Sequence, residues 1–509
     1  MAQSDVLTLH NNVARTGLNQ SETILTPSNV NSKTFGKLFQ VTLDGVVDAQ
    51  PLYVAGVSMP KKGVHNVLIV ATENDSLYAL DADSGAQLWK AVLLGSGETP
   101  SDIRGCGQVA PQIGITSTPV IELQRGGATG AIYAVAMSKD SAGNYYQRLY
   151  KVDLKDGQSM VPAAVIAAQY PGTGANSQNG SVIFDPAQYK ERSGLILVNG
   201  TVYLGWASHC DIEPYTGWIM GYSATKLTQT SVLNITPNGS EGAIWGSGAG
   251  FAADPLGNLF FLDANGTFDT TSNSQGFPSQ GDFGNAFIKL STAGKQLAVA
   301  DYFSMHNTTS ESNADQDLGS GGAMILPDMT DASGQIQQLA IGAGKDGNIY
   351  VVNRNNMGKF NPQNDSAIYQ ELSGALPGGI FSMPAFYNGS VYFGAVGGPL
   401  RQFQFRDAML VPTPASVTAT QFAYPGATPS ISSNGSSDAI LWAIENSSPA
   451  VLHAYSAVNL AQELYNSSQA ANGRDSFGAG NKYMVPAIAN GKVYVGTPNG
   501  VAAFGLLNH

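Results

Sequence analysis

The sequence predicts an all-β protein that forms a single eight-bladed β-propeller of four-stranded antiparallel blades. Helical periodicity is nearly absent, short apolar runs alternate with turns along the whole chain, and 59 of the 509 residues are glycine. The apolar runs return with a period of about 45 to 65 residues. This period is too long for a solenoid repeat and suits a four-stranded propeller blade.

The repeating unit is a short apolar strand, a polar turn with glycine and a second strand that carries Tyr or Phe. Such a hairpin cannot bury both of its faces alone, so it must stack on its neighbours. Tandem β-sandwiches are the alternative, but no Pro/Ser-rich linker divides the chain. We therefore expect one domain over 1–509, with blades at about 36–97, 112–165, 180–236, 240–304, 316–372, 376–416, 424–466 and 476–509.

The chain ends and one internal segment have their own predicted roles. The last blade is short, and the segment 35–43 supplies its missing strand and closes the ring, which removes exposed sheet edges. The extension 1–34 packs on the ring, where His10, Asn12 and Arg15 either plug one face or form a terminal strand. The clearest helical pattern, at 459–469, predicts one short helix.

Composition excludes several classes of partner. Charged residues are 12% of the chain and the net charge is −12. A chain so poor in Lys and Arg lacks the electrostatic footprint of a nucleic-acid binder and is a poor partner for an anionic membrane. No apolar run approaches the roughly 18 residues of a membrane-spanning helix. We expect a monomer.

The compartment is predicted from the N-terminus and the cysteines. Met1-Ala2-Gln3-Ser4 leads directly into β-like sequence without a signal peptide, and Ala-Gln-Ser resembles a mature N-terminus left by signal cleavage. Cys106 and Cys210 are too few for a Cys-rich zinc site and enough for one disulfide. We expect a secreted or periplasmic protein. A cytosolic protein with two buried thiols is the alternative.

One segment carries a specific motif. Ala79–Trp89, with the sequence ALDADSGAQLW, fits A-x-D-x-x-[TS]-G-x-x-x-W at every fixed position. It resembles the tryptophan repeat of quinoprotein (PQQ-dependent) alcohol dehydrogenases and their PQQ-like propeller relatives. Fragments shared with the uncharacterised secreted bacterial branch of these proteins lie at 10–17, 113–120 and 317–322. The resemblance implies the propeller fold, with Trp89 packed between blades. Non-catalytic propellers carry the repeat too, so it does not imply the activity.

The same resemblance implies a set of site residues. Enzymes of that family bury the quinone on the ring axis beside Ca²⁺ or a lanthanide, which prefers oxygen ligands. Sequence context implies Asn265 as a metal ligand, Asp317 as catalytic base and metal ligand, and Lys345 as the cation at the quinone carbonyls. The resemblance also implies Asp211 or Glu213 as a metal-binding carboxylate and Asp48 as a cofactor contact. Asp315, two residues before Asp317, lies on the same side of an extended chain and is a further candidate metal ligand.

Other positions depart from the family pattern. The family clamps the quinone under two adjacent cysteines, whereas Cys106 is followed by Gly107, and the quinone-binding Arg expected next is missing. Gly248 stands where the family has the Trp below the quinone, and Trp245, three residues earlier, is the candidate for that contact. The two cysteines are candidates for a disulfide with each other that ties neighbouring blades.

Simpler interpretations of the site residues stay open. His209, in a polar segment beside Asp211 and Tyr215, is a candidate base or metal ligand, and a solvent-facing loop position is the alternative. Asn265 and Asp317 also fit ordinary turn caps. No H-E-x-x-H, G-x-S-x-G or P-loop motif points to another chemistry.

Three functions follow from these residues. The first is a secreted or periplasmic oxidoreductase with PQQ and Ca²⁺ or a lanthanide, in which Asp317 takes a proton from a small alcohol or sugar. The second is a non-catalytic propeller that binds glycan or protein after loss of the quinone clamp, with a metal alone or none. The third is a carbohydrate-cleaving hydrolase or lyase that uses axial carboxylates.

Overall fold

The computed structural model describes residues 5–507 except 125–128, 247 and 295, and most of the regular structure in it is strand. Over those residues the helical segments are α1 (Thr308–Asn313), η1 (Leu318–Ser320) and η2 (Ala471–Gly473). Within the same part of the chain, no helix has the length and apolar character needed to cross a bilayer. The all-β prediction is confirmed.

Among the described residues, eight sheets contain four or five strands each, and we number them in chain order. Sheet 1 consists of β3 (Leu52–Met59), β4 (Gly63–Thr72), β5 (Ser76–Asp81) and β6 (Gln87–Val92). Sheet 2 consists of β7 (Thr99–Pro100), β8 (Val120–Leu123), β9 (Gly130–Lys139), β10 (Tyr145–Asp153) and β11 (Ala164–Val165). Sheet 3 consists of β15 (Tyr189–Glu191), β16 (Ile196–Val198), β17 (Thr201–Ser208), β18 (Trp218–Ser223) and β19 (Gln229–Asn234).

The middle of the chain forms the next three sheets. Sheet 4 consists of β20 (Ala252–Ala253), β21 (Leu259–Leu262), β22 (Phe287–Ser291), β23 (Ala298–Ser304) and β29 (Lys359–Phe360). Sheet 5 consists of β24 (Met324–Ile325), β27 (Leu339–Ala343), β28 (Ile349–Asn353) and β30 (Gln370–Leu372). Sheet 6 consists of β31 (Ala385–Tyr387), β32 (Ser390–Gly394), β33 (Gly398–Arg406), β34 (Met409–Leu410) and β35 (Ser416–Phe422).

The last two sheets each take one strand from the N-terminal region. Sheet 7 consists of β1 (Leu18–Asn19), β36 (Ser430–Asn434), β37 (Ser437–Glu445), β38 (Val451–Ser456) and β39 (Asn459–Asn466). Sheet 8 consists of β40 (Ala487–Ala489), β41 (Lys492–Thr497), β42 (Gly500–Leu506) and β2 (Phe35–Thr42). Minor sheets are formed by β12 (Gln169–Pro171), β13 (Ser177–Gln178) and β14 (Ser181–Ile183), and by β25 (Met329–Thr330) and β26 (Ile336–Gln337).

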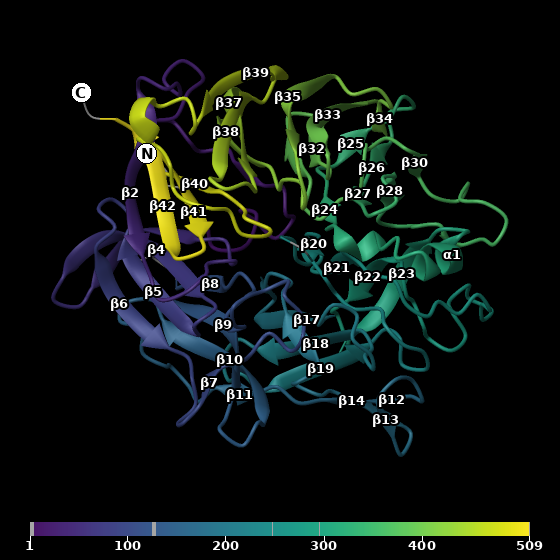
Figure 1. Ribbon diagram of the computed structural model, residues 1–509. Helices are drawn as coiled ribbons and strands as arrows, with labels where there is room; N and C mark the ends of the chain where they lie inside the picture. The colour runs from purple at the N-terminus through teal and green to yellow at the C-terminus, as the bar shows by residue number, and fades with distance from the viewer. Residues whose placement is uncertain (1–4, 125–128, 247, 295, 508–509) are drawn as a thin grey trace.

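The eight large sheets follow one another in chain order around a common centre, with sheet 8 beside sheet 1 (Figure 1). The antiparallel pairing of β2 with β42 gives sheet 8 its fourth strand from the N-terminal segment, as the sequence predicts. The hydrophobic core lies between neighbouring sheets, and one of its clusters combines side chains of sheets 8, 1 and 2. The apolar side chains are therefore buried only when neighbouring sheets stack on one another, because a single sheet of this size cannot cover its own faces.

Asn-Gly pairs join two consecutive strands in several sheets. They are Asn199-Gly200 in sheet 3, Asn388-Gly389 in sheet 6 and Asn490-Gly491 in sheet 8, with φ values of 49° and 74°, 44° and 77°, and 50° and 75°. A two-residue type I′ hairpin needs positive φ at both central positions, which Asn and Gly tolerate best. These dipeptides are the local signal that sets the hairpin register.

The tryptophan motif has the roles that the resemblance implies. Trp89 Nε1 donates a 3.0 Å hydrogen bond to the carbonyl oxygen of Leu154, next to sheet 2. Gly157 allows the close contact, because a Cβ there would lie 2.7 Å from Trp89 Cε3. Asp81 Oδ1 accepts hydrogen bonds from the backbone N–H of Asp83 and from the Ser84 N–H and hydroxyl, which fixes the turn. Trp89 thus links sheets 1 and 2.

The predicted helix at 459–469 is wrong, because Asn459–Asn466 is strand β39. It pairs antiparallel with β38 at the edge of sheet 7. Leu460 and Tyr465 are buried there, so the apolar residues that suggested a helical face instead contact the neighbouring sheet. Tertiary pairing overrides a weak local preference in such short segments.

Residues 6–19, which we call the N-terminal strap, contact all eight large sheets. The hydrogen bonds join Val6 to Tyr53 of sheet 1, Leu7 to Ile121 of sheet 2, Thr8 to Leu195 beside sheet 3, Val13 to Ala253 of sheet 4, Ala14 to Ile325 of sheet 5, Thr16 to Phe386 of sheet 6, Gly17 to Ile431 of sheet 7 and Asn19 to Ile488 of sheet 8. Each partner lies in or directly beside one strand of its sheet, and these strands are β3, β8, β16, β20, β24, β31, β36 and β40. The strap therefore ties one strand of each of the eight sheets together.

Replacing Arg15 by Met is expected to lower the free energy of unfolding by about 3 kcal/mol, because it leaves buried acceptors without donors. The guanidinium is fully buried and donates to the carbonyl oxygens of Leu9, Leu195 and Phe251 at 2.6, 3.1 and 2.8 Å. Denaturant titration measures the loss. Asn12→Ala is the control within the strap and should cost less than about 1 kcal/mol. Equal midpoints for the two variants would contradict the role of Arg15.

Candidate active site

A pocket lies where loops of sheets 2 to 8 converge. Its polar and charged lining consists of Gln108, Arg192, Asp211, Asp317, Ser320 and Lys345. Its aromatic lining consists of Trp245, Phe381, Tyr424 and Tyr483. The lining residues are spread over most of the chain, so the pocket exists only when the sheets are assembled.

Asp317, Lys345 and Asn265 form a connected group at this pocket. Asp317 immediately precedes the short helix η1; its Oδ1 accepts a 2.8 Å hydrogen bond from the Asn265 N–H, and its Oδ2 lies 2.5 Å from Lys345 Nζ. Gly319 lets η1 approach sheet 4, since a Cβ there would lie 2.4 Å from Ala264 N. The structure thus brings together three residues that the resemblance implies.

Burial and charge set the protonation of this group. Burial raises the pKa of Asp317 to about 6, although the Lys345 ammonium opposes the shift. Burial by itself would lower the pKa of Lys345, but the Asp317 and Asp315 carboxylates raise it. Near neutral pH the pair is therefore an ammonium beside a carboxylate whose pKa is close to the solution pH, as a general base requires.

An acidic outer cleft adjoins the pocket through the shared residue Asp211. Glu241, Asn265 and Asp315 also line this cleft, and Asp315 Oδ1 lies 2.6 Å from Lys345 Nζ. Burial and the neighbouring Glu213 and Asp211 carboxylates raise the pKa of Glu241 to about 7. Sequence reasoning missed Glu241, since it stands alone in a Gly/Ser-rich segment and its acidic neighbours come from other loops.

The donor set for a cation is only partly assembled. Asn265 is 7% exposed, and its Oδ1 has no hydrogen-bond partner among the described residues. An unpaired amide oxygen beside several carboxylates matches the ligand chemistry of a hard cation. In the described part of the chain, however, no three His, Cys, Asp or Glu side chains are grouped closely enough to hold a metal ion.

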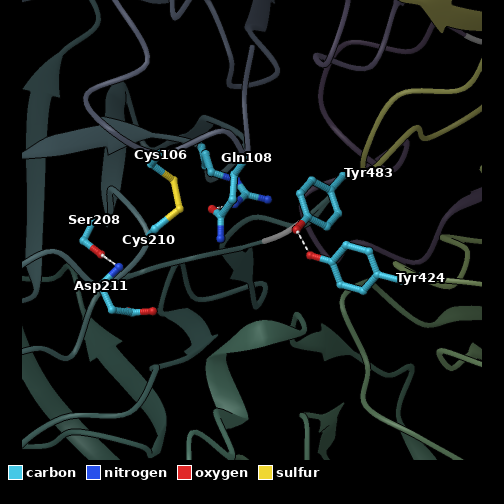
Figure 2. Close-up of a disulfide and its surroundings, with 8 residues drawn as sticks. Cys106, Gln108, Ser208, Cys210, Asp211, Tyr424 and Tyr483 are labelled. Carbon is cyan, nitrogen blue, oxygen red and sulfur yellow. Dashed lines mark hydrogen bonds between the residues drawn. A yellow bond between two sulfur atoms is a disulfide. The ribbon is translucent and has the colours of Figure 1, made fainter.

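A disulfide joins Cys106 to Cys210 and links the loops of sheets 2 and 3. Gln108 follows Cys106 by two residues, Asp211 follows Cys210 directly, and both line the pocket. In Figure 2, Gln108 lies between the disulfide and the Tyr424–Tyr483 pair. The bond between the two cysteines, a candidate in the sequence, thus fixes one wall of the pocket.

The remaining predicted residues are divided between the pocket and its surroundings. Trp245 lines the pocket, while Asp48 lines an adjoining cavity and accepts a 2.9 Å hydrogen bond from Asn481. Glu213 accepts a hydrogen bond from the Tyr215 N–H and does not line the pocket.

His209 is buried and does not line the pocket. Burial and the nearby Lys190 lower the pKa of His209 to about 3, so its imidazole is neutral.

Sequence reasoning missed six lining residues, namely Gln108, Arg192, Ser320, Phe381, Tyr424 and Tyr483. The two tyrosine hydroxyls are 3.0 Å apart. Nothing local distinguishes these two among the 21 tyrosines of the chain. Arg192 did carry a signal, because Lys190-Glu191-Arg192 is a run of charged residues in a chain with few of them.

Comparison with known proteins shows the fold. No protein-family model and no curated sequence matches the chain. Among solved structures, a quinohemoprotein alcohol dehydrogenase from Pseudomonas putida HK5 is 14% identical, with a TM-score of 0.65 over 99% of this chain and 80% of that chain. The Comamonas testosteroni quinohemoprotein alcohol dehydrogenase is 12% identical, with a TM-score of 0.62 over 99% and 80%. A europium-containing methanol dehydrogenase is 11% identical, with a TM-score of 0.59 over 99% and 98%. The chain shares the β-propeller fold of these dehydrogenases.

Proposed function

We propose that the protein is an oxidoreductase of the PQQ-dependent type that acts on a small alcohol or sugar at the axis of a closed, eight-bladed propeller. The observation that carries this proposal is the ion pair of buried Asp317 with partly buried Lys345 at an aromatic-lined pocket. The shared fold and the resemblance of the segments around Asp317 and Lys345 to the family pattern support it. We further propose that it works outside the cytoplasm as a monomer, consistent with the disulfide.

In this proposal Asp317 is the general base. Its carboxylate is buried at the pocket, where it accepts the proton of the substrate hydroxyl. The Asn265 N–H and the Lys345 ammonium hold this carboxylate in one orientation. Asp315 and Asp317 in turn hold the ammonium in place. The quinone, when bound, supplies the acceptor for the two electrons of the substrate C–H bond.

The pocket residues fit a planar, carboxylated quinone. Trp245, Phe381 and Tyr424 provide flat apolar surfaces, and Arg192 and Lys345 provide positive charge for carboxylate and carbonyl oxygens. Asn265 Oδ1, which has no hydrogen-bond partner among the described residues, and the adjoining carboxylates of Asp317 and Asp211 are oxygen ligands of the kind that a hard cation prefers. These residues would hold the two groups if both are bound.

Glycan binding is a second candidate function. The Tyr424 ring is 43% exposed and contacts Phe381 with ring centroids 5.2 Å apart. Exposed aromatic rings beside carboxylates suit sugar stacking as well as quinone binding. If the protein has this second function, it binds glycans without any redox cofactor, whether or not it also cleaves them.

The test of the proposal is a thermal melt of chelator-treated protein with PQQ, with Ca²⁺ or La³⁺, and with both together. Tight binding is expected to add about 3–4 kcal/mol of stability at a few hundred times the dissociation constant. The largest shift is expected with PQQ and metal together, followed by dye-linked turnover of alcohols or sugars. A melt unchanged by PQQ in every combination contradicts the proposal, and a glycan-induced shift would then support the second candidate.

A further inference from the structure

Asp317 lies in a stretch of chain without regular secondary structure. Residues 316–317 connect the end of α1 to η1, so no strand pairing holds them. Asp315, just before them, has a left-handed backbone with a φ of 58° and is exposed. The direction of the Asp317 side chain therefore depends on contacts that come from other parts of the fold.

One buried side chain contacts both peptide groups of Asp317. Asn285 is 0% exposed and stands two residues before β22 of sheet 4. Its Oδ1 accepts a 2.7 Å hydrogen bond from the Leu318 N–H, and its Nδ2 donates a 3.5 Å hydrogen bond to the Gln316 carbonyl oxygen. This carbonyl and this N–H belong to the two peptide bonds on either side of Asp317. The planar amide of Asn285 thus brackets the candidate base.

The backbone of Asn285 is fixed in turn and also holds the start of the segment that carries Asp317. The Asn285 N–H donates a 2.6 Å hydrogen bond to the carbonyl oxygen of Ala264, two residues after β21. Thr308, the first residue of α1, donates a 3.2 Å hydrogen bond from its hydroxyl to the Asn285 carbonyl oxygen. Asn285 has a φ of 60°, a conformation that asparagine and glycine tolerate best. Sheet 4 therefore presents a fixed polar anchor to the loop that leads to sheet 5.

The contacts of Asn285 differ in kind from those of the other neighbours of Asp317. The Asn265 N–H and the Lys345 ammonium hold the carboxylate itself. Asn285 holds the backbone on both sides, and the two peptide planes set the direction of the Cα–Cβ bond. A primary amide offers a donor and an acceptor in one plane, as this arrangement requires. A reacting group that is displaced by about 1 Å can lose about 100-fold in rate.

We propose that Asn285 is a positioning residue, which holds Asp317 in the orientation in which this carboxylate takes the substrate proton. The inference rests on the proposed function, in which Asp317 is the general base. Asn285 does not line the pocket, so it acts through Asp317 and not on a bound ligand. Its loss should therefore lower kcat and leave KM and the affinity for PQQ unchanged.

The test is the substitution Asn285→Gly, because glycine keeps the left-handed backbone and removes the amide. Dye-linked kcat per bound PQQ is expected to fall about 10- to 100-fold, with KM and PQQ affinity within about twofold of the wild type. Asn285→Asp keeps the acceptor for the Leu318 N–H and should lie between Asn285→Gly and the wild type. The matched control is Asn388→Gly, at a φ of 44° in an exposed turn of sheet 6, which should turn over like the wild type.

Hydrogen exchange gives a second readout that needs no cofactor. The Leu318 amide should be protected in the wild type, and Asn285→Gly should speed exchange over residues 316–320 about 10-fold, as for one lost hydrogen bond. The eight sheets should keep their protection. A thermal melt reports whether each variant is folded. A purely structural role of Asn285 would lower the melting temperature and leave kcat per bound PQQ at the wild-type value.

The outcomes separate this inference from the proposed function. If folded Asn285→Gly keeps the wild-type kcat, or the wild-type exchange over 316–320, the inference is wrong while the proposed function stands. If the wild type shows no PQQ-dependent turnover of any alcohol or sugar, both are wrong. If Asn285→Gly does not fold, exchange in the wild type decides: protection of the Leu318 amide supports the inference, and exchange as fast as in an exposed loop contradicts it.

Discussion

Removing the Cys106–Cys210 disulfide by the double substitution Cys106→Ala and Cys210→Ala is expected to lower the free energy of unfolding by about 4–5 kcal/mol. The two cysteines are 104 residues apart in sequence. A cross-link that closes a loop of this length removes much conformational entropy from the unfolded chain, and about 4.7 kcal/mol is the chain-entropy value for a loop of about 100 residues. Alanine is chosen because Cys106 is 1% exposed and a serine hydroxyl would be buried there.

Chemical denaturation with and without reductant measures this effect. Reductant should destabilise the wild type by a similar amount and leave the double variant unchanged, which serves as the internal control. In a chain of this size the expected change in melting temperature is about 4 °C, because the unfolding entropy scales with length. Equal stabilities of oxidised wild type and double variant would show that the bond adds nothing to the fold.

Asp317→Asn is expected to reduce dye-linked turnover by about 10²- to 10⁴-fold while the protein stays folded. Asparagine has the same shape and still accepts the Asn265 N–H, but it cannot take a proton from the substrate. Asp315→Asn is the matched control, because Asp315 contacts the same Lys345 ammonium from a largely exposed position. Full turnover in Asp317→Asn would exclude Asp317 as the base.

The pH profile of the wild type adds a second readout of Asp317. Its pKa is about 6, and the base must be ionised to act, so turnover should fall as the pH drops through 6. Asp315→Asn removes a neighbouring negative charge that raises this pKa, so its profile should shift to lower pH. A profile that stays flat between pH 5 and 8 contradicts this assignment.

Part of the candidate site was predictable because its residues follow local motifs. Asp317 opens a glycine-rich segment and Lys345 precedes a Gly-x-apolar-Tyr strand, and the structure brings the two into contact. Arg192 and Glu241 were not predictable in the same way, since their contacts lie on other sheets. His209 was misleading for the same reason: a polar sequence context surrounds an imidazole that the fold buries away from the pocket.

The sequence by itself predicted the all-β class and the glycine-containing turns between short strands, because both follow from patterns along the chain, and the resemblance of the 79–89 motif implied the packing of Trp89 between blades. The tertiary structure alone decided that 459–466 is a strand, that the strap binds all eight sheets and that Cys106 meets Cys210. It also decided which tyrosines line the pocket. These features join residues far apart in the chain, and local sequence patterns hold no information on which distant loops converge.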